Sequence, residues 1–280
     1  MTAGRWAGRS AIVTGGASGI GRALGARLAE AAAHVVLADV DGEGASAAAR
    51  SMSASVTAAT LDVRDAAAVE RLVAEVVGER GRLDLLINNA GISLGGRSHL
   101  MPAEHWERTL EVNLGGVVNG VLAAYPQMVR QGSGQIVNVA SMAGLAPTPF
   151  TVAYVASKHG VVGLSTALRI EAEVHGVGVT VLCPGSIETP ILDKGPADDL
   201  PSAPVGTLTP RAFLEIAHLR PMPVERFAAA ALRGIERNRA VVIVPRSGYP
   251  LWWLQRASPW AMGKVAGVLA RRVQRELPQD

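Results

Sequence analysis

The chain has 280 residues, of which 49% are hydrophobic and 18% are charged. This balance predicts a globular protein with a substantial core and excludes a disordered chain. Its net charge is +3, but the segment 246–280 holds six basic residues against two acidic ones, so this segment carries +4 and the rest of the chain −1. A nearly neutral body excludes a general nucleic-acid-binding face.

The single cysteine, Cys183, excludes an intramolecular disulfide and fits a reducing, cytoplasmic compartment. The first nine residues do not resemble a secretory signal, and uncharged apolar runs fall short of the roughly 20 residues of a membrane span. The six histidines show no metal-ligand spacing, so we expect no metal site.

Apolar, β-prone runs alternate with helical patterns along the chain, which predicts an α/β fold: a doubly wound parallel sheet with helices on both faces. The predicted strands are 11–13, 34–38, 56–61, 83–87, 135–139, 177–182 and 240–244. The predicted helices are 19–32, 42–52, 66–80, 103–130 with a break near Asn113, 151–174 and 210–238. We therefore expect one catalytic domain over residues 1–245, with a helical C-terminal extension of the same domain over 246–280.

The proline-rich segment 188–208 is irregular, and its length and position favour a mobile lid, reaching to about 222, over a plain surface loop.

A glycine-rich turn, residues 14–21, connects the first strand to the first helix. Glycines let the backbone approach phosphates, and the helix N-terminus offers free N–H groups, so the turn predicts a pyrophosphate site. Taken alone, such glycines also serve ordinary turns. The candidate contacts are Gly15, Ser18, Gly19, Ile20 and Gly21.

Asp39 ends the second strand, where a carboxylate accepts the adenosine ribose hydroxyls and repels a 2′-phosphate. This favours NAD over NADP, although Asp is also common in turns. Further polar and small residues end the third and fourth strands at the same sheet edge, which indicates cofactor contact. They are Asp62, Val63, Asn89, Ala90 and Gly91.

Tyr154 and Lys158 are four residues apart on a predicted helix and so share one face. A fixed cation favours the phenolate and is expected to lower the pKa of the tyrosine, which makes it a usable acid or base. Ser141 follows the fifth strand, where its hydroxyl can bond a substrate oxygen. Asn113 can open its helix locally and hold a water.

These motifs, in this order, resemble the short-chain dehydrogenases/reductases from about Arg9 to Val244, with TGGASGIG at 14–21, NNAG at 88–91, YVASK at 154–158 and PGSIETP at 184–190. The resemblance implies a Rossmann-type fold, a homotetramer or homodimer built on the helices near 103–130 and 151–174, and a catalytic tetrad. It assigns Tyr154 as acid/base, Ser141 as substrate orienter, Lys158 as ribose ligand and Asn113 as water anchor. It adds the cofactor contacts Pro184, Gly185, Ile187 and Thr189. Ala140 departs from the family, many members of which have a second serine there.

The residues expected around the substrate are apolar, and no arginine cluster is placed to hold a carboxylate or phosphate. We therefore expect hydride transfer between NAD(H) and a hydrophobic secondary alcohol or ketone of steroid, terpenoid or aliphatic type. The alternatives are a 3-oxoacyl-thioester reductase and a non-catalytic NAD-binding regulatory protein. The predicted pocket residues are Leu94, Met142, Leu145, Phe150, Ile191 and Leu192.

The extension contains two adjacent tryptophans and an amphipathic helical run over 259–277, with apolar residues on one face and Lys264, Arg271 and Arg275 on another. Such a helix either packs on the body or on a sister subunit, or lies on an anionic membrane as a peripheral contact. Packing is the favoured interpretation, because paired tryptophans are strong interface anchors.

Overall fold

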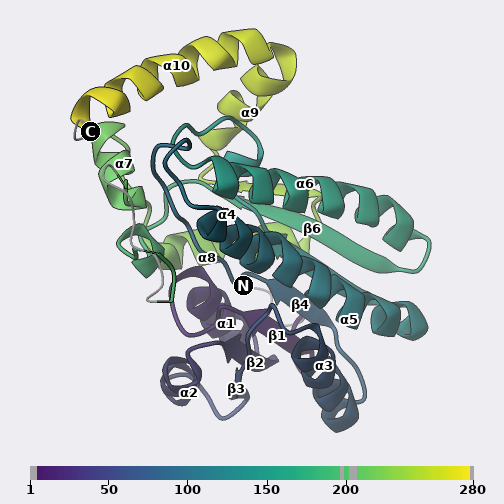
Figure 1. The fold of residues 1–280 in the computed structure, drawn as a ribbon. Coiled ribbons are helices and arrows are strands. Elements are labelled where there is room, and N and C mark those ends of the chain that lie inside the picture. The colour runs from purple at the N-terminus through teal and green to yellow at the C-terminus, as the bar shows by residue number, and fades with distance from the viewer. Residues whose placement is uncertain (1–4, 196–198, 202–206, 278–280) are drawn as a thin grey trace.

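The computed structural model describes residues 5–195, 199–201 and 207–277 (Figure 1). One sheet of seven parallel strands, in the order β3-β2-β1-β4-β5-β6-β7, forms its centre and confirms the predicted doubly wound α/β fold. Because helices cover both faces, the central strands are almost wholly buried and read as apolar runs, whereas the edge strand 56–60 is partly exposed. The strands are β1 (Ser10–Thr14), β2 (His34–Asp39), β3 (Val56–Thr60), β4 (Leu85–Asn88), β5 (Gly134–Val139), β6 (Val177–Pro184) and β7 (Val241–Val244).

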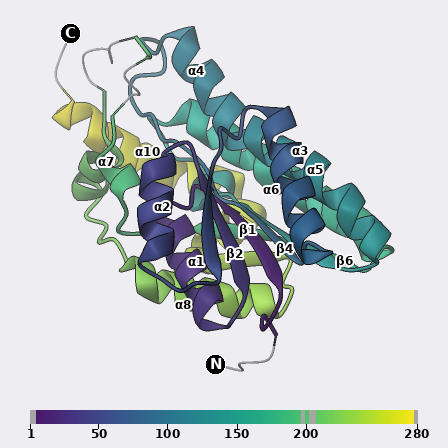
Figure 2. The same cartoon turned by 90° about the horizontal axis from the view of Figure 1, so that it is seen from below.

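The helices form two layers (Figures 1 and 2). One layer contains α1, α2 and α8, whose apolar side chains share a core with one face of the sheet. The other contains α3, α5 and α6, which pack on the opposite face. The helices are α1 (Gly19–Glu30), α2 (Gly42–Arg50), α3 (Ala66–Arg80), α4 (Ala103–Leu110), α5 (Gly116–Gln131), α6 (Val152–Glu173), α7 (Pro210–Ile216), α8 (Val224–Glu236), α9 (Gly248–Ala257) and α10 (Pro259–Glu276).

Two expectations about helices were incomplete. The predicted helix 210–238 is two helices, α7 and α8, because Pro221 and Pro223 lack the N–H groups that a continuous helix needs. The segment with the two tryptophans is not predicted as a separate helix, but in the structure it forms α9. The predicted break near Asn113 is confirmed as a π-helical turn, Glu111–Gly115, between α4 and α5.

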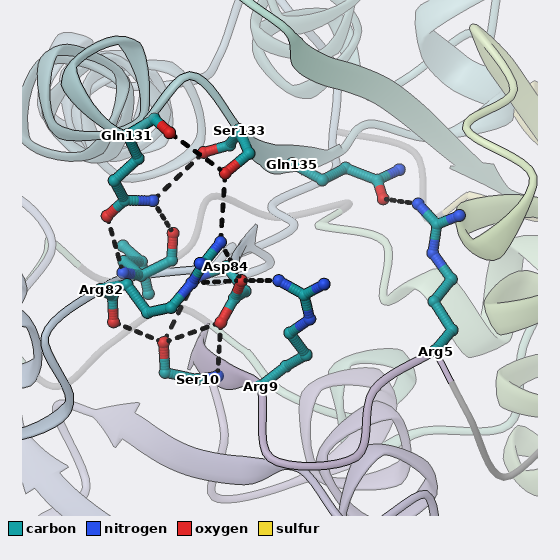
Figure 3. A network of polar contacts seen from close by, with 9 residues as sticks. Arg5, Arg9, Ser10, Arg82, Asp84, Gln131, Ser133 and Gln135 are labelled. Carbon is teal, nitrogen blue, oxygen red and sulfur yellow. Dashed lines mark hydrogen bonds and ion pairs between the residues drawn. The ribbon is translucent and has the colours of Figure 1, made fainter.

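A polar network holds together the amino ends of β1, β4 and β5 (Figure 3). Its centre is the buried Asp84, whose carboxylate accepts from Arg9 Nη1 at 2.6 Å, from Arg82 Nε at 2.8 Å and from the backbone N–H of Ser10 at 3.0 Å. These strands start on the edge of the sheet opposite the predicted site. The network therefore fixes the sheet without taking part in binding.

The strand order reverses between β1 and β4, since the chain winds outward from β1 to β3 and then returns to β4 on the other side of β1. In open parallel sheets, ligands bind beyond the carboxyl ends of the strands at such a switch point. The glycine-rich turn after β1 and the 88–91 motif after β4 meet there. The topology therefore brings together the residues that the motifs single out.

Candidate active site

The turn between β1 and α1 is built so that backbone, rather than side chains, faces the site. Gly15 and Gly19 have φ of +66° and +51°, which favour glycine. Gly21 lies below them, and a Cβ there would come 2.1 Å from the carbonyl oxygen of Gly15. Ser18, the N-cap of α1, makes no side-chain capping bond, so the first N–H groups of α1 lack a side-chain partner. These groups fit a pyrophosphate.

Asn89 fastens the loop after β4 to this turn. Its Nδ2 donates to the carbonyl oxygens of Thr14 at 2.9 Å and Gly15 at 3.2 Å, and its backbone N–H donates to Thr14 Oγ1 at 2.9 Å. The backbone N–H of Ala90 donates to the same hydroxyl at 3.1 Å. The NNAG motif therefore has a structural role: it holds the loop after β4 against the glycine-rich turn.

Asp39 stands at the end of β2 beside the glycine-rich turn. Its Oδ2 accepts from the backbone N–H of Ala17 at 3.0 Å, and its Oδ1 accepts from that of Asp41 at 3.1 Å. These bonds fix the carboxylate beside the glycine-rich turn, on the wall of the cavity. Asp62, at the next strand end, is paired with Arg64, whose guanidinium lowers the pKa of that carboxyl.

Tyr154 and Lys158 lie side by side on the first turns of α6, with Nζ 5.6 Å from the centre of the phenol ring. Lys158 is 3% exposed and donates to the carbonyl oxygen of Val139 at 2.9 Å. Because burial disfavours the ammonium, the pKa of Lys158 falls to about 8. The expected lowering of the tyrosine pKa is not found in the protein alone: burial raises the pKa of Tyr154, and the hydrogen bond with Ser141 opposes this only in part. The phenol is therefore held protonated.

Ser141 follows β5 and begins a short 3₁₀ turn, where its Oγ accepts from the backbone N–H of Ala143 at 3.1 Å. This turn lies directly on α6, because Gly144 has no Cβ; one built there would come 2.5 Å from the carbonyl oxygen of Lys158. The glycine thus allows the serine to approach the tyrosine. This steric requirement was not visible in the sequence pattern.

Asn113 sits in the π turn and is completely buried. Its Oδ1 accepts from the backbone N–H of Ile92 at 2.8 Å, and its Nδ2 donates to the carbonyl oxygen of Ile92 at 2.9 Å and to Ser157 Oγ at 3.2 Å. Ser157 Oγ in turn donates to the carbonyl oxygen of Tyr154 at 2.7 Å. The asparagine therefore joins the 91–92 loop to the turn of α6 that carries Tyr154, and it is not among the residues that line the cavity.

The loop after β6 closes the site from the other side. Thr189 is buried, and its Oγ1 donates to the carbonyl oxygen of Ile187 at 3.3 Å. A Cβ on Gly19 would lie 3.3 Å from the Thr189 side chain, so this loop touches the glycine-rich turn directly. Pro184 and Gly185 line the same space at the end of β6. Parts of the predicted lid, 196–198 and 202–206, fall outside the described residues.

One cavity of about 910 Å³ connects these parts. It runs from Asp39 and the glycine-rich turn, past Ser141, Tyr154 and Lys158, to an apolar end. All predicted cofactor contacts line it except Gly21, which supports the turn from below. The predicted contacts on its wall are Gly15, Ser18, Gly19, Ile20, Asp39, Asp62, Val63, Asn89, Ala90, Gly91, Tyr154, Lys158, Pro184, Gly185, Ile187 and Thr189.

Three of the six residues predicted around the substrate lie on this cavity. Met142, Ile191 and Leu192 line the cavity. Leu145 instead packs into the core with Val181 and Cys183, because the 3₁₀ turn directs it beneath the sheet end. Phe150 packs against the lid segment, and Leu94 is buried outside the cavity wall.

The apolar end of the cavity is formed mainly by the segment around α7 and by the helices α9 and α10. The sequence alone does not connect α9 and α10 with the substrate. In the structure the C-terminal extension packs on the body, which is the favoured interpretation. The apolar face of α10 was recognisable as a stripe, but nothing in the sequence showed what it covers. The residues are Leu208, Phe213, Leu214, Leu251, Met262, Val265, Ala266 and Leu269.

Within the described ranges, no three His, Cys, Asp or Glu side chains are grouped to hold a metal ion. In the same ranges, none of the helices combines the length and apolarity of a membrane span.

Comparisons with known proteins agree with this geometry. The sequence model of the short chain dehydrogenase family matches residues 9–199, and the chain belongs to this family of oxidoreductases. It is 35% identical over 268 residues to the probable oxidoreductase EphD of Mycobacterium tuberculosis, covering 91% of this chain but only 44% of that protein.

The chain is 33% identical over 227 residues to D-beta-hydroxybutyrate dehydrogenase of Rhizobium meliloti, covering 78% of this chain and 86% of that protein. A solved short-chain dehydrogenase/reductase from Burkholderia phymatum, in complex with NAD, is 31% identical with a TM-score of 0.82, covering 90% of this chain and 94% of that one.

Proposed function

We propose that the protein transfers a hydride between NAD(H) and a hydrophobic secondary alcohol or ketone, with Tyr154 as general acid/base. The observation that carries this proposal is one cavity that connects the Asp39 carboxylate and the glycine-rich turn, through the Ser141–Tyr154–Lys158 group, to an apolar end. The NAD complex of the Burkholderia phymatum relative supports the choice of cofactor.

Gly15, Ser18 and Gly19 would hold the pyrophosphate, Asp39 the adenosine ribose, Lys158 the nicotinamide ribose, and Ile187 with Thr189 the carboxamide. The bound nicotinamide supplies the hydride acceptor or donor. Ser141 donates to the substrate oxygen and fixes its position beside the phenol. Tyr154 as the phenol donates its proton to a carbonyl oxygen that is being reduced; in the oxidative direction it acts as the phenolate, which takes the proton of the alcohol.

The raised pKa of Tyr154 suits the reductive direction, because a protonated phenol is the form that donates. Lys158, with a pKa of about 8, is mostly protonated near neutral pH, and this cation can stabilise the phenolate left behind. Asn113 positions α6 through Ser157 and is proposed to anchor the water that returns the proton.

Besides Lys158, four cations line the cavity: Arg64 and Arg108, which are paired with Asp62 and Asp199, and the two cations Lys194 and Arg220. Lys194 and Arg220 favour one second candidate, the reductase of a 3-oxoacyl thioester, whose carrier is anionic. Both cations are exposed and lie among many apolar lining residues, so the hydrophobic alcohol or ketone remains the primary proposal. We also propose that the tail contacts a membrane and that the chain assembles through the helices around 103–130 and 151–174. These two proposals are independent of the proposed hydride transfer.

The test is NADH formation from NAD, beside NADPH formation from NADP, over a panel of hydrophobic secondary alcohols, with acetoacetyl-CoA and NADH as the thioester arm. Tyr154→Phe should lower kcat by roughly 10²–10⁴-fold while NADH binding, followed by its fluorescence, is retained. Equal turnover by the wild type and Tyr154→Phe would refute the assignment of the acid/base. NADH binding without turnover of any substrate would favour the non-catalytic alternative.

A further inference from the structure

The C-terminal helix α10 has two faces of opposite character. Met262 and Val273 are buried against the body. The other face carries Trp260, Lys264 and Arg271, spaced by four and seven residues, so these side chains share one side of the helix. Trp260 is 74% exposed. In Figure 1, α10 lies at the periphery of the molecule beside α7 and α9, away from the sheet.

The outward face of α10 is basic. Arg275 continues the row of cations by one further turn, and Lys264 Nζ lies 5.5 Å from the centre of the Trp260 ring. Across the described part of the extension, residues 246–277, Glu276 is the sole acidic residue. Tryptophan beside lysine and arginine is the composition that places a helix in the headgroup region of an anionic bilayer.

The same helices form the rim of the cavity. Leu251 of α9 and Val265 of α10 line the cavity and are also 42% and 49% exposed, so they stand where it opens to the outside. Trp253, on the same short helix as Leu251, is 59% exposed. The apolar end of the cavity therefore opens at α9 and α10, the two helices that carry the exposed tryptophans and cations.

We infer that the outer face of α9 and α10 docks on an anionic lipid bilayer, with the apolar mouth of the cavity turned toward the lipid. The part of this inference that concerns substrate entry rests on the proposed function. A second copy of the chain fits this face less well, because a two-fold contact would bring its own cations together without an acidic partner. A bilayer containing anionic lipid supplies the opposite charge and an apolar interior together.

The first test is co-sedimentation of the full chain with vesicles of phosphatidylcholine alone and with added phosphatidylglycerol. Binding should require the anionic lipid and weaken with salt. The triple variant Lys264→Glu/Arg271→Glu/Arg275→Glu should lose roughly a hundredfold or more in partitioning. The matched control Arg80→Glu/Arg226→Glu/Arg233→Glu changes the net charge equally on exposed positions of α3 and α8, and it should keep most of the binding.

Brominated lipids report the contact itself. They should quench the fluorescence of the wild type, and the double variant Trp253→Phe/Trp260→Phe should lose most of that quenching. The inference is overturned if neither vesicle binds, or if both triple variants lose binding equally. It is also overturned if sedimentation equilibrium shows that the triple variant abolishes a dimer instead of lipid binding.

Substrate entry is tested by comparing a water-soluble secondary alcohol with a long-chain one dissolved in the vesicles. The triple variant should keep its activity on the soluble alcohol and lose at least tenfold on the vesicle-borne one. Equal activity of wild type and variant on both would refute entry from the lipid. A wild type inactive on both alcohols refutes the proposed function and the entry route, while vesicle binding separately decides the docking surface.

Discussion

The buried positive charge of Lys158 is expected to lower the free energy of unfolding of the protein. Its ammonium is 3% exposed, and burial lowers its pKa from 10.5 to about 8. A difference of this size between folded and unfolded chains corresponds to about 3 kcal/mol below pH 8. Lys158→Met removes the charge at similar length and leaves the carbonyl oxygen of Val139 without its donor, a loss of about 1 kcal/mol. The variant should therefore be more stable by about 2 kcal/mol at pH 7 in the absence of cofactor.

The sign of the pH dependence follows from proton binding. Between about pH 8 and 10.5 the unfolded chain still holds the proton that the folded lysine has released, so the wild type gains stability as the pH rises. Burial also raises the pKa of Tyr154 and that of Cys183, the latter to about 12, which acts in the opposite direction. Both groups remain in the variant, and the difference between the two proteins isolates the lysine.

The assay is urea unfolding of wild type and Lys158→Met at pH 7, 8, 9 and 10 without cofactor, with the oligomeric state checked at each pH. The advantage of the variant should shrink with rising pH and reverse near pH 10, where the remaining penalty of the lysine equals the hydrogen bond of about 1 kcal/mol that the variant loses. Turnover should fall sharply in the variant at every pH. A variant that is less stable at pH 7, with a gap that does not change with pH, would show that the lysine is not destabilised by burial.

Three further substitutions have defined outcomes. Asp39→Ala should reduce the preference for NAD over NADP by about tenfold or more in kcat/KM, on the order of 1.4 kcal/mol, and unchanged selectivity would contradict its role. Gly21→Ala should destabilise the fold by about 1–3 kcal/mol and raise the Kd for NADH, because the new Cβ would lie 2.1 Å from the carbonyl oxygen of Gly15; calorimetry and titration measure both. Asp84→Asn should lower stability by about 2 kcal/mol, since the Ser10 N–H and two arginines lose a carboxylate. A changed KM without that loss would mean that the amino edge of the sheet affects the site.

Strands and site residues could be predicted from the sequence where the local residue pattern alone determines their position in the fold. The strand pattern gave all seven strands because both faces of the sheet are buried. Motif residues such as Asp39 and Tyr154 were found because they follow strands or share a helix face, and the structure places both on one cavity. The helix break near Asn113 is predictable because an asparagine interrupts an otherwise helical run, and the structure shows this break as a π turn.

The remaining features depend on tertiary contact. Leu145 and Phe150 are apolar and close to Ser141 in sequence, yet they point into the core and toward the lid segment. The prolines at 221 and 223 signalled a helix break that the apolar periodicity masked. The pKa of Tyr154 was expected to fall beside Lys158, but burial, which the sequence does not report, is the larger effect. The apolar stripe on α10 shows that this helix is amphipathic, but the sequence does not show which surface the apolar face packs against.

The two ends of the cavity are lined by different stretches of the chain. The groups assigned to the hydride and its cofactor lie between Gly15 and Thr189, whereas the far wall begins at Leu208 and ends at Leu269. Under the proposed function, the groups that act on the cofactor and most of the apolar wall lie in consecutive stretches of the sequence, although Met142, Ile191 and Leu192 line the cavity from before Leu208. Replacing α9 and α10 by the corresponding helices of a relative should then change the substrate preference and leave the cofactor site in place. Substitutions in these two helices should likewise alter the accepted substrate while hydride transfer is retained.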